Sequence, residues 1–173
     1  MADSERIVRG TVTQSSDQNM REVQVNLQED EVRDGIEHFE PYGFSSEPFI
    51  DGNTDALTVF FDDSREHGAV ICVADRRYRI KTLEKGEVVI YDDKKRKIHL
   101  KRDGILIDGA DSPVTVTTSA NVVINASQVQ INADVQVNGT LTATGDITGG
   151  SIVLQSHTHG GVESGGSSTG GPQ

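Results

Sequence analysis

The sequence has few of the large aromatic residues that fill a hydrophobic core and few of the cysteines that cross-link one. It contains no tryptophan and one cysteine, and aromatic residues make up 5% of its 173 positions. A single cysteine cannot form an intrachain disulfide, so we expect the chain to fold in a reducing cytosol. That cysteine, Cys72, lies in the apolar run GAVICVAD and is predicted to be a small buried hydrophobic residue.

Positive charge is also scarce. Sixteen Lys and Arg residues face 27 Asp and Glu residues, which gives a formal net charge of −11. Because a protein that binds phosphate backbones needs a surplus of basic residues, no nucleic-acid partner is expected. The first residues lack the apolar core of a cleaved secretion signal, and no apolar run approaches the ~18 residues of a membrane-spanning helix. We therefore expect a soluble protein that is made in the cytoplasm.

The composition changes sharply along the chain. Every Lys and Arg lies at or before Arg102, and the last aromatic residue is Tyr91. Residues 103–173 contain six acidic residues, no basic residue and twelve of the eighteen glycines. The sequence therefore predicts a conventional domain over residues 1–109 and a different kind of structure after Gly109.

The first part is predicted to be all-β. Two of its predicted strands each place three apolar side chains on one face: Val23, Val25 and Leu27 in the first, and Leu57, Val59 and Phe61 in the second. Four more short apolar runs follow, separated by charged or glycine-containing turns, and no run has a sustained helical period. Five or six short strands in about a hundred residues indicate a small barrel or sandwich, and the oligonucleotide/oligosaccharide-binding (OB) barrel is one candidate.

The second part is rich in Val, Ile, Thr, Asn and Ala in alternation, over residues 112–156. A seven-residue echo relates residues 122–126 to residues 129–133. Such a segment has unpaired edges and no bulky side chains for a core of its own. A single-chain β-solenoid, an amyloid-like segment and a multi-chain β-structure are the possible explanations. A solenoid usually needs three stacked repeats, and only two clear copies are present.

We interpret this segment as an intertwined trimer, a triple-stranded β-helix over residues 110–150 with an apex over residues 151–173. Small apolar side chains suit a narrow core on a threefold axis, and intertwining removes every exposed edge. Fully extended at ~3.3 Å per residue, residues 112–156 would reach at most ~150 Å.

Two histidines, His157 and His159, stand near the end of this segment. In an extended chain, residues two apart point to the same side. Three chains around an axis would then offer six imidazole nitrogens, which suits an octahedral ion such as iron, nickel or cobalt better than tetrahedral zinc. Raw affinity favours copper or zinc, and the alternative is that both histidines are solvated. They share the strand parity of Val153 rather than of the more apolar Ile152, so we expect a bend near Ser156 or an inward Val153.

Two charged motifs lie in the first part of the sequence. The run DDKKRK at residues 92–97 is predicted to be a solvated turn between strands rather than a nucleic-acid site. The run DRRYR at residues 75–79 mixes charge with an aromatic residue, and we expect it to form salt bridges to other subunits or to a partner protein.

Three parts of the sequence resemble one protein family. They are GIEHFEPYGFSSEPFIDGNTDALTVFF, then HGAVICVADRRYRIKTLEKGEVVIYDDKKRKIHLKRDGILIDG, and finally HTHGGVESGGSSTGGP. In this order they are similar to baseplate assembly protein V, the central spike protein of Mu-like contractile-tailed bacteriophages. The resemblance runs from about Val8 to Pro172.

The resemblance implies a homotrimer with an OB-fold-like barrel at its base, a triple-stranded β-helix as its shaft and a pointed apex. It also implies one structural iron per trimer, bound by His157 and His159 of three chains. Some members of the family hold further axial ions such as calcium or chloride, and no residue of this sequence is assigned to them.

The function implied is mechanical. The spike would sit at the tip of the tail baseplate in the virion after assembly in the host cytoplasm, bind the tail hub and pierce the host outer membrane. It would be no enzyme and have no catalytic residues and no small-molecule substrate. Two alternatives stay open: an OB-type binding module for oligosaccharide or single-stranded nucleic acid, and a spike-associated hydrolase of cell-envelope glycan, although the chain has no room for a separate catalytic domain.

Overall fold

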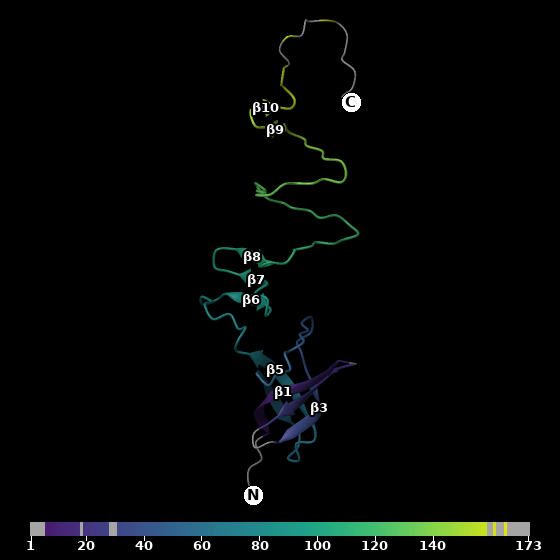
Figure 1. Ribbon diagram of the computed structural model, residues 1–173, viewed down its shortest axis with the longest axis vertical. Coiled ribbons are helices and arrows are strands. Elements are labelled where there is room, and N and C mark those ends of the chain that lie inside the picture. The colour runs from purple at the N-terminus through teal and green to yellow at the C-terminus, as the bar shows by residue number, and fades with distance from the viewer. Residues whose placement is uncertain (1–5, 18, 28–30, 159–160, 162–164, 166–173) are drawn as a thin grey trace. The chain divides into compact units, whose positions relative to one another are not determined.

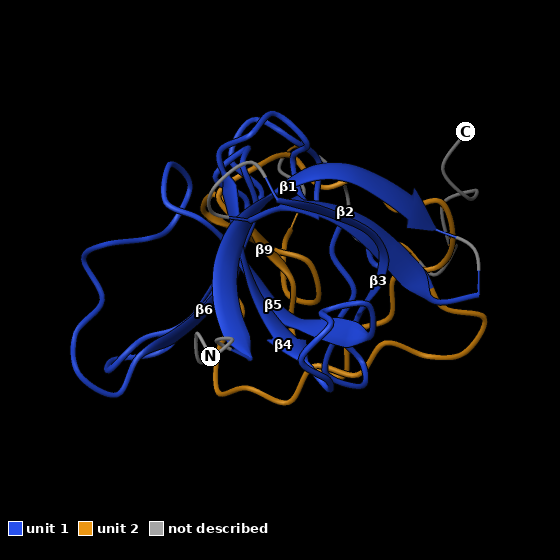
Figure 2. Ribbon diagram, turned by 90° about the horizontal axis from the view of Figure 1, so that it is seen from below, with its two compact units in different colours: residues 1–117 blue, residues 118–173 orange. Residues whose placement is uncertain are grey.

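The computed structural model describes residues 6–17, 19–27, 31–158, 161 and 165. All regular structure in this part of the chain is β, which confirms the predicted class. Within the same residues, no helix is long and apolar enough to cross a membrane. The chain forms two compact units, residues 1–117 and residues 118–173 (Figure 2).

The first five strands form a closed barrel (Figure 1). They are β1 (Ile7–Asp17), β2 (Arg21–Asn26), β3 (Val32–His38), β4 (Thr54–Phe60) and β5 (Gly68–Asp75). Their order around the barrel is β1-β2-β3-β5-β4, and β4 pairs back to β1. A short parallel pairing of β3 with β5 closes the barrel, with Glu37 opposite Ala69 and His38 opposite Val70. Five strands is the number in an OB barrel, and the assignment to that type stays a prediction.

The barrel core is built from small and branched side chains around one phenylalanine. Val23, Val25 and Leu27 are buried in it, as their shared face suggested. In β4, however, the inward face carries the residues of the other parity: Thr54, Ala56, Thr58 and Phe60. The apolar face chosen by sequence pattern, which ends at Phe61, lies outside because the register with β1 and β5 fixes which side of β4 looks inward.

Cys72 is exposed, and the prediction that it is buried was wrong. The cause is a register shift between Leu57 and Thr58 of β4, which pair with Cys72 and Val70 of β5. Ile71 is therefore an extra residue on β5. A bulge of this kind reverses the alternation, so Val70 points into the barrel while Cys72 points out.

The three strands that follow form a sheet separate from the barrel. They are β6 (Val88–Tyr91), β7 (Lys97–Leu100) and β8 (Ile105–Asp108), antiparallel in that order. Residues 76–87, which join β5 to this sheet, contain no strand. The turn between β6 and β7 is closed by the Asp92 carboxylate, which accepts hydrogen bonds from the N–H groups of Lys94 and Arg96 at 2.9 and 3.0 Å. The prediction of a turn at this charged run is confirmed.

The second unit has little regular structure within one chain. Its described strands are β9 (Thr148–Gly149) and β10 (Ile152–Val153), which pair as a short antiparallel hairpin. Residues 118–147 have no strand partner. The predicted triple-stranded β-helix is not seen in a single chain and stays a prediction, as do the domain boundaries after residues 109 and 150.

Candidate functional site

One face of the β6–β8 sheet is entirely aliphatic and exposed. Cross-strand pairing aligns its members in two rows: Val88, Leu100 and Ile105 in one, and Ile90, Ile98 and Ile107 in the other. Each of the six side chains is between 45% and 72% exposed. Aliphatic residues aligned across three strands are the pattern of a face that packs in a core. Within the described residues of one chain, nothing buries it.

The opposite face of the same sheet is mixed, and its polar groups have partners. It carries Lys97, His99 and Asp108 beside Val89, Tyr91 and Leu106. Lys97 Nζ lies 2.8 Å from the Asp108 carboxylate, and the hydrogen bond from Lys97 lowers the pKa of Asp108. His99 Nε2 lies 3.1 Å from Glu87, and both side chains are largely buried. The two faces therefore differ, because one is entirely aliphatic and the other holds paired charged groups among apolar ones.

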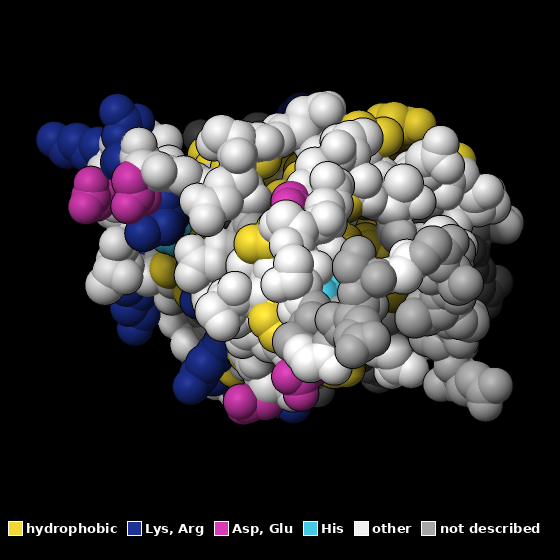
Figure 3. Space-filling model, turned by 90° about the horizontal axis from the view of Figure 1, so that it is seen from above, with side chains coloured by type: hydrophobic (Ala, Val, Ile, Leu, Met, Phe, Trp, Pro, Cys, Tyr) yellow, Lys and Arg dark blue, Asp and Glu magenta, His cyan; other side chains and the backbone are white. Residues whose placement is uncertain are grey.

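The segment after this sheet exposes apolar side chains in the same way. The members that are at least 42% exposed are Val114, Val116, Val122, Val123, Ile124, Val129, Ile131, Val135, Val137, Leu141 and Ile147. Hydrophobic side chains are visible at the surface in the space-filling view (Figure 3). Monomeric soluble proteins rarely expose contiguous apolar surface on this scale, so the segment has the character of one part of a larger core.

The β9–β10 hairpin positions the residues before the first apex histidine. Leu154 N–H donates to Ile147 O at 2.8 Å, and Gln155 N–H donates to the Asp146 carboxylate at 3.2 Å. β10 ends at Val153, and a turn follows in which Ser156 N–H donates to Val153 O at 3.3 Å. The chain thus bends near Ser156, which is one of the two outcomes that the strand parity of the histidines required.

His157 is exposed, and its ring orientation is set by the backbone. Nδ1 lies 2.9 Å from the carbonyl oxygen of Leu154. Because a carbonyl only accepts, Nδ1 carries the proton, and Nε2 is the nitrogen with the lone pair that a metal ion requires. A ring N–H bonded to a backbone carbonyl is a common arrangement in metal-binding histidines.

The remaining features of the predicted metal site lie outside one chain's described residues. His159 is not among the residues that the structure describes. Across the described ranges of a single chain, no group of three His, Cys, Asp or Glu side chains is arranged to hold a metal ion. Among the described residues, His157 could therefore supply one imidazole ligand to an iron ion, and the other ligands would have to come from elsewhere.

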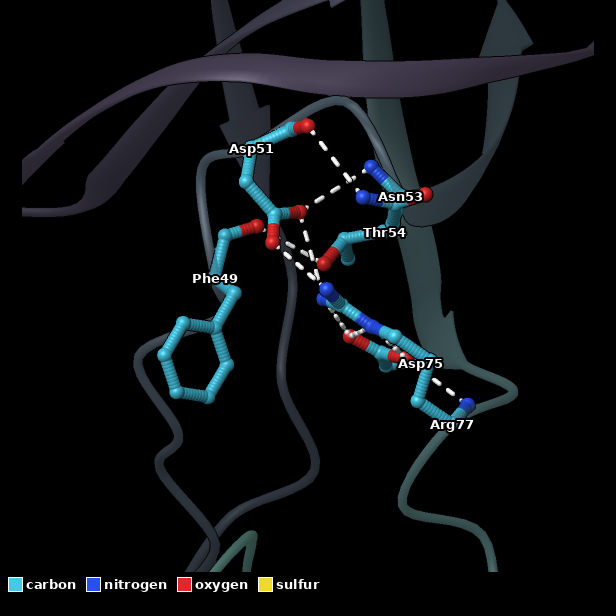
Figure 4. A network of polar contacts seen from close by, with 6 residues as sticks. All are labelled: Phe49, Asp51, Asn53, Thr54, Asp75 and Arg77. Atoms are coloured by element: carbon cyan, nitrogen blue, oxygen red, sulfur yellow. Dashed lines mark hydrogen bonds and ion pairs between the residues drawn. The ribbon is translucent and has the colours of Figure 1, made fainter.

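A polar network fixes the loop before β4 to the barrel (Figure 4). Arg77 Nη1 lies 2.6 Å from Asp51, and Arg77 Nε lies 3.0 Å from Asp75. Hydrogen bonds from Arg77 lower the pKa of both carboxyl groups. Arg76 pairs with Asp55 at 3.0 Å. Two arginines of the DRRYR motif, Arg76 and Arg77, therefore pair within the chain, and the expectation of bridges to other subunits or to a partner protein stays a prediction for Arg79.

Sequence pattern overlooked the aromatic side chains of the loop that this network fixes. The segment between β3 and β4 carries several exposed aromatic side chains, among them Tyr42 and Phe44. Four of the chain's eight Phe and Tyr residues fall within residues 39–49, and that concentration was the available signal.

Two family models match this chain. The model described as "Bacteriophage Mu Gp45, N-terminal" matches residues 9–77, which is the barrel together with the first residues after β5. The model described as "GpV Apex motif" matches residues 151–173, which include both histidines. The two matches lie in the order that the sequence resemblance predicted.

Two curated proteins are similar to the chain. "Baseplate puncturing device gp45" of Escherichia phage Mu is 30% identical over 126 residues, which are 73% of this chain and 62% of that protein. "Mu-like prophage FluMu protein gp45" of Haemophilus influenzae is 26% identical over 159 residues, which are 88% of this chain and 85% of that protein. The chain thus spans less than two thirds of the phage Mu protein.

Proposed function

The barrel of this chain belongs to the bacteriophage Mu Gp45 N-terminal family and its last residues carry the GpV apex motif, and from this premise we propose that the chain is the central spike of a contractile-tail baseplate. Three copies assemble around one axis, with the barrel at the base and the apex at the tip. The name of the phage Mu relative, a baseplate puncturing device, supports this role.

The observation that carries the proposal is the unburied apolar surface after residue 87. It comprises the aliphatic face of β6–β8 and the exposed Val, Ile and Leu side chains of residues 114–147. At roughly 25 cal/mol per Å² of apolar surface, leaving this much side chain in water is a large cost that a single chain does not recover. Three copies that turn these surfaces toward a shared axis would recover it and would pair the backbone of residues 118–147 between chains.

The apex closes this assembly. We propose that His157 and His159 of three chains hold one structural iron on the axis, with the carbonyl of Leu154 orienting the ring of His157. Such an ion would tie together three chain ends that otherwise fray. Its binding free energy would also favour the trimer, because the site exists only when three chains meet.

The activity proposed is mechanical rather than enzymatic. Contraction of the tail would drive the spike, and its tip would cross the outer membrane of the host while the barrel stays attached to the hub. In the virion the protein would lie at the tip of the tail baseplate. A hydrolase of cell-envelope glycan would instead show turnover of purified peptidoglycan, and we expect none.

Mass and metal content measured on the same sample test the proposal. Light scattering should give three times 18.7 kDa, and plasma mass spectrometry should find one iron per three chains. His157→Ala should remove the iron, while His67→Ala, which changes an exposed histidine in the β4–β5 loop, should retain it. A monomer would contradict the spike, and one metal ion per chain would contradict the shared apex site.

A further inference from the structure

The loop between β3 and β4 exposes an unusual amount of aromatic surface. Of the eight Phe and Tyr residues in the chain, Phe60 is the one in the barrel core. Residues 39–50, here called the aromatic loop, carry five large side chains that are 44% to 105% exposed: Phe39, Tyr42, Phe44, Phe49 and Ile50. Aromatic side chains gathered at a surface are typical of the centre of a protein–protein interface.

The aromatic loop is held in place by ion pairs on its inner side. Arg21, itself 8% exposed, places its guanidinium 3.2 Å from Glu47 and 3.7 Å from Glu40. Glu40 in turn accepts a hydrogen bond from Ser46 N–H at 2.7 Å. Buried charge used in this way orders the loop before any partner arrives, and preorganised loops lose less entropy on binding.

The end of the loop is fixed as well. Thr54 Oγ1 donates to Phe49 O at 2.7 Å, and Asp51 pairs with Arg77 (Figure 4). The ring of Phe49 also lies 5.4 Å from that of Tyr78, between centroids. Phe49 thus packs against the same chain, while Tyr42, at 105% exposed, projects fully into solvent.

Strand register places the loop next to the chain's exit from the barrel. Thr54, directly after the loop, pairs with Asp75, the last residue of β5. The segment of residues 76–87, here called the connector, begins there. Loop and connector therefore lie at the same end of the barrel. Three copies that share an axis through β6–β8 would bring the loop of one copy close to the connector of the next.

The charges of the two segments are complementary. Residues 34–63, which include the aromatic loop, contain eight acidic residues and no Lys or Arg. Five of the eight already pair with arginines of the same chain, and the other three are Asp34, Glu37 and Asp62. The connector contains five basic and two acidic residues. Two of its basic residues, Arg76 and Arg77, pair with barrel carboxylates. Arg79, Lys81 and Lys85 are exposed and have no ion pair with the described residues of their own chain.

We propose that the aromatic loop of one copy docks against the connector of the neighbouring copy in the trimer. Arg79 and Lys81 would lie on the faces of Tyr42 and Phe44 as cation–π contacts, and the acidic residues near the loop would pair with the connector. Two different patches on each copy make a head-to-tail contact, and such contacts close into a ring when the copies are related by a threefold axis. The inference rests on the proposed trimer and adds to it a second interface, at the barrel.

Hydroxyl-radical footprinting of the full-length protein, read by mass spectrometry, tests this docking. Oxidation of Tyr42 and Phe44 is compared between the native protein and the unfolded chain. If the loop is docked, both residues should be oxidised severalfold more slowly than their exposure in a single copy would allow. The double variant R79E/K81E should restore their reactivity, while K94E/K95E, an equal charge reversal at the β6–β7 turn, should leave them protected.

Light scattering on the same samples separates the two proposals. A wild-type trimer whose Tyr42 and Phe44 react as freely as in a single copy would overturn the docking and leave the spike standing. It would also mean that the aromatic loop is left for another tail protein. If Tyr42 and Phe44 stay protected from oxidation in an R79E/K81E trimer, the connector is not the docking partner. A monomer would overturn the trimer itself.

Discussion

At the scale of single residues, His38 is the titratable group most deeply enclosed in the barrel. It is 4% exposed, and its Nδ1 has no hydrogen-bond partner among the described residues. Burial lowers its pKa, the carboxylates of Glu40 and Glu47 raise it, and Arg21 lowers it further. The net direction is down, so the folded barrel holds His38 neutral where an unfolded chain would protonate it.

The barrel should therefore lose stability in mild acid. The unfolded pKa is 6.5 and the folded pKa is lower, so the contribution of His38 is complete above pH 6.5 and is lost as the pH falls below it. At pH 5.5 the loss should reach up to about 1.4 kcal/mol of unfolding free energy. Urea unfolding at pH 7.5 and 5.5 measures it. His38→Asn should flatten the pH dependence and His67→Asn should not, and an unchanged slope in His38→Asn would contradict this account.

Gly10 in β1 is a second position where one residue decides the packing. A Cβ there would lie 2.5 Å from Asn26 O and 2.6 Å from Val25 Cγ1. Because backbone and core would both have to move, Gly10→Ala should destabilise the barrel by about 1–3 kcal/mol. Gly104→Ala is the matched control, since nothing lies within 4 Å of its Cβ position and the change should stay within about 0.5 kcal/mol. Denaturant midpoints of the two variants that coincide would contradict the prediction.

At the scale of elements, the β6–β8 sheet is the part of the chain that most needs a partner. On its mixed face, Lys97 pairs with Asp108 and His99 pairs with Glu87. Its aliphatic face is open, with Ile98 on the central strand between Ile90 and Ile107. The sheet is therefore a sensitive place to test association, because a change there leaves the barrel core untouched.

Ile98→Lys should prevent assembly. It would bring three ammonium groups together near the axis of the trimer in place of three aliphatic side chains, each worth about 1.5–3 kcal/mol when fully buried. Light scattering should show a fall from three times 18.7 kDa toward a single chain. Leu106→Lys places the same charge on the other face of the sheet and should assemble normally. An Ile98→Lys trimer as stable as the wild type would rule out this face as the inner one.

At the scale of the whole molecule, association and closure of the tip are separate events. Most of the exposed apolar side chains lie between residues 88 and 147, whereas the proposed metal site begins at His157. Burial drives assembly over a long stretch of chain, and a single ion secures only its end.

Removal of metal should therefore loosen the apex without dissociating the trimer. After treatment with a strong chelator, the light-scattering mass should stay that of three chains. Limited proteolysis should then cut residues 151–173 severalfold faster, because chain ends that are no longer tied together fray. Dissociation into single chains on chelation would show instead that the metal, and not the apolar surface, holds the copies together.

Several features could be predicted from the sequence because they depend on local composition and order. The end of basic and aromatic residues near Arg102 predicted a domain boundary after Gly109, which stays a prediction. Alternation located the strands, as at Val23 and Val25, and the Asp92–Lys97 run marked a turn. The His-x-His and the glycine-rich run after it carried the apex resemblance, and the family matches confirm it.

By itself, then, the sequence determined the β class, the place of the strands and the family. Tertiary structure alone decided which side of β4 and of β5 is inside. The bulge at Ile71 turned Cys72 outward, and closure of the barrel put Thr58 rather than Leu57 in the core. Only the tertiary structure also separated β6–β8 from the barrel and left one face of that sheet bare. The physical reason is that the alternation of apolar and polar residues determines which side chains share a face of a strand. Pairing with strands that are distant in sequence determines what that face packs against.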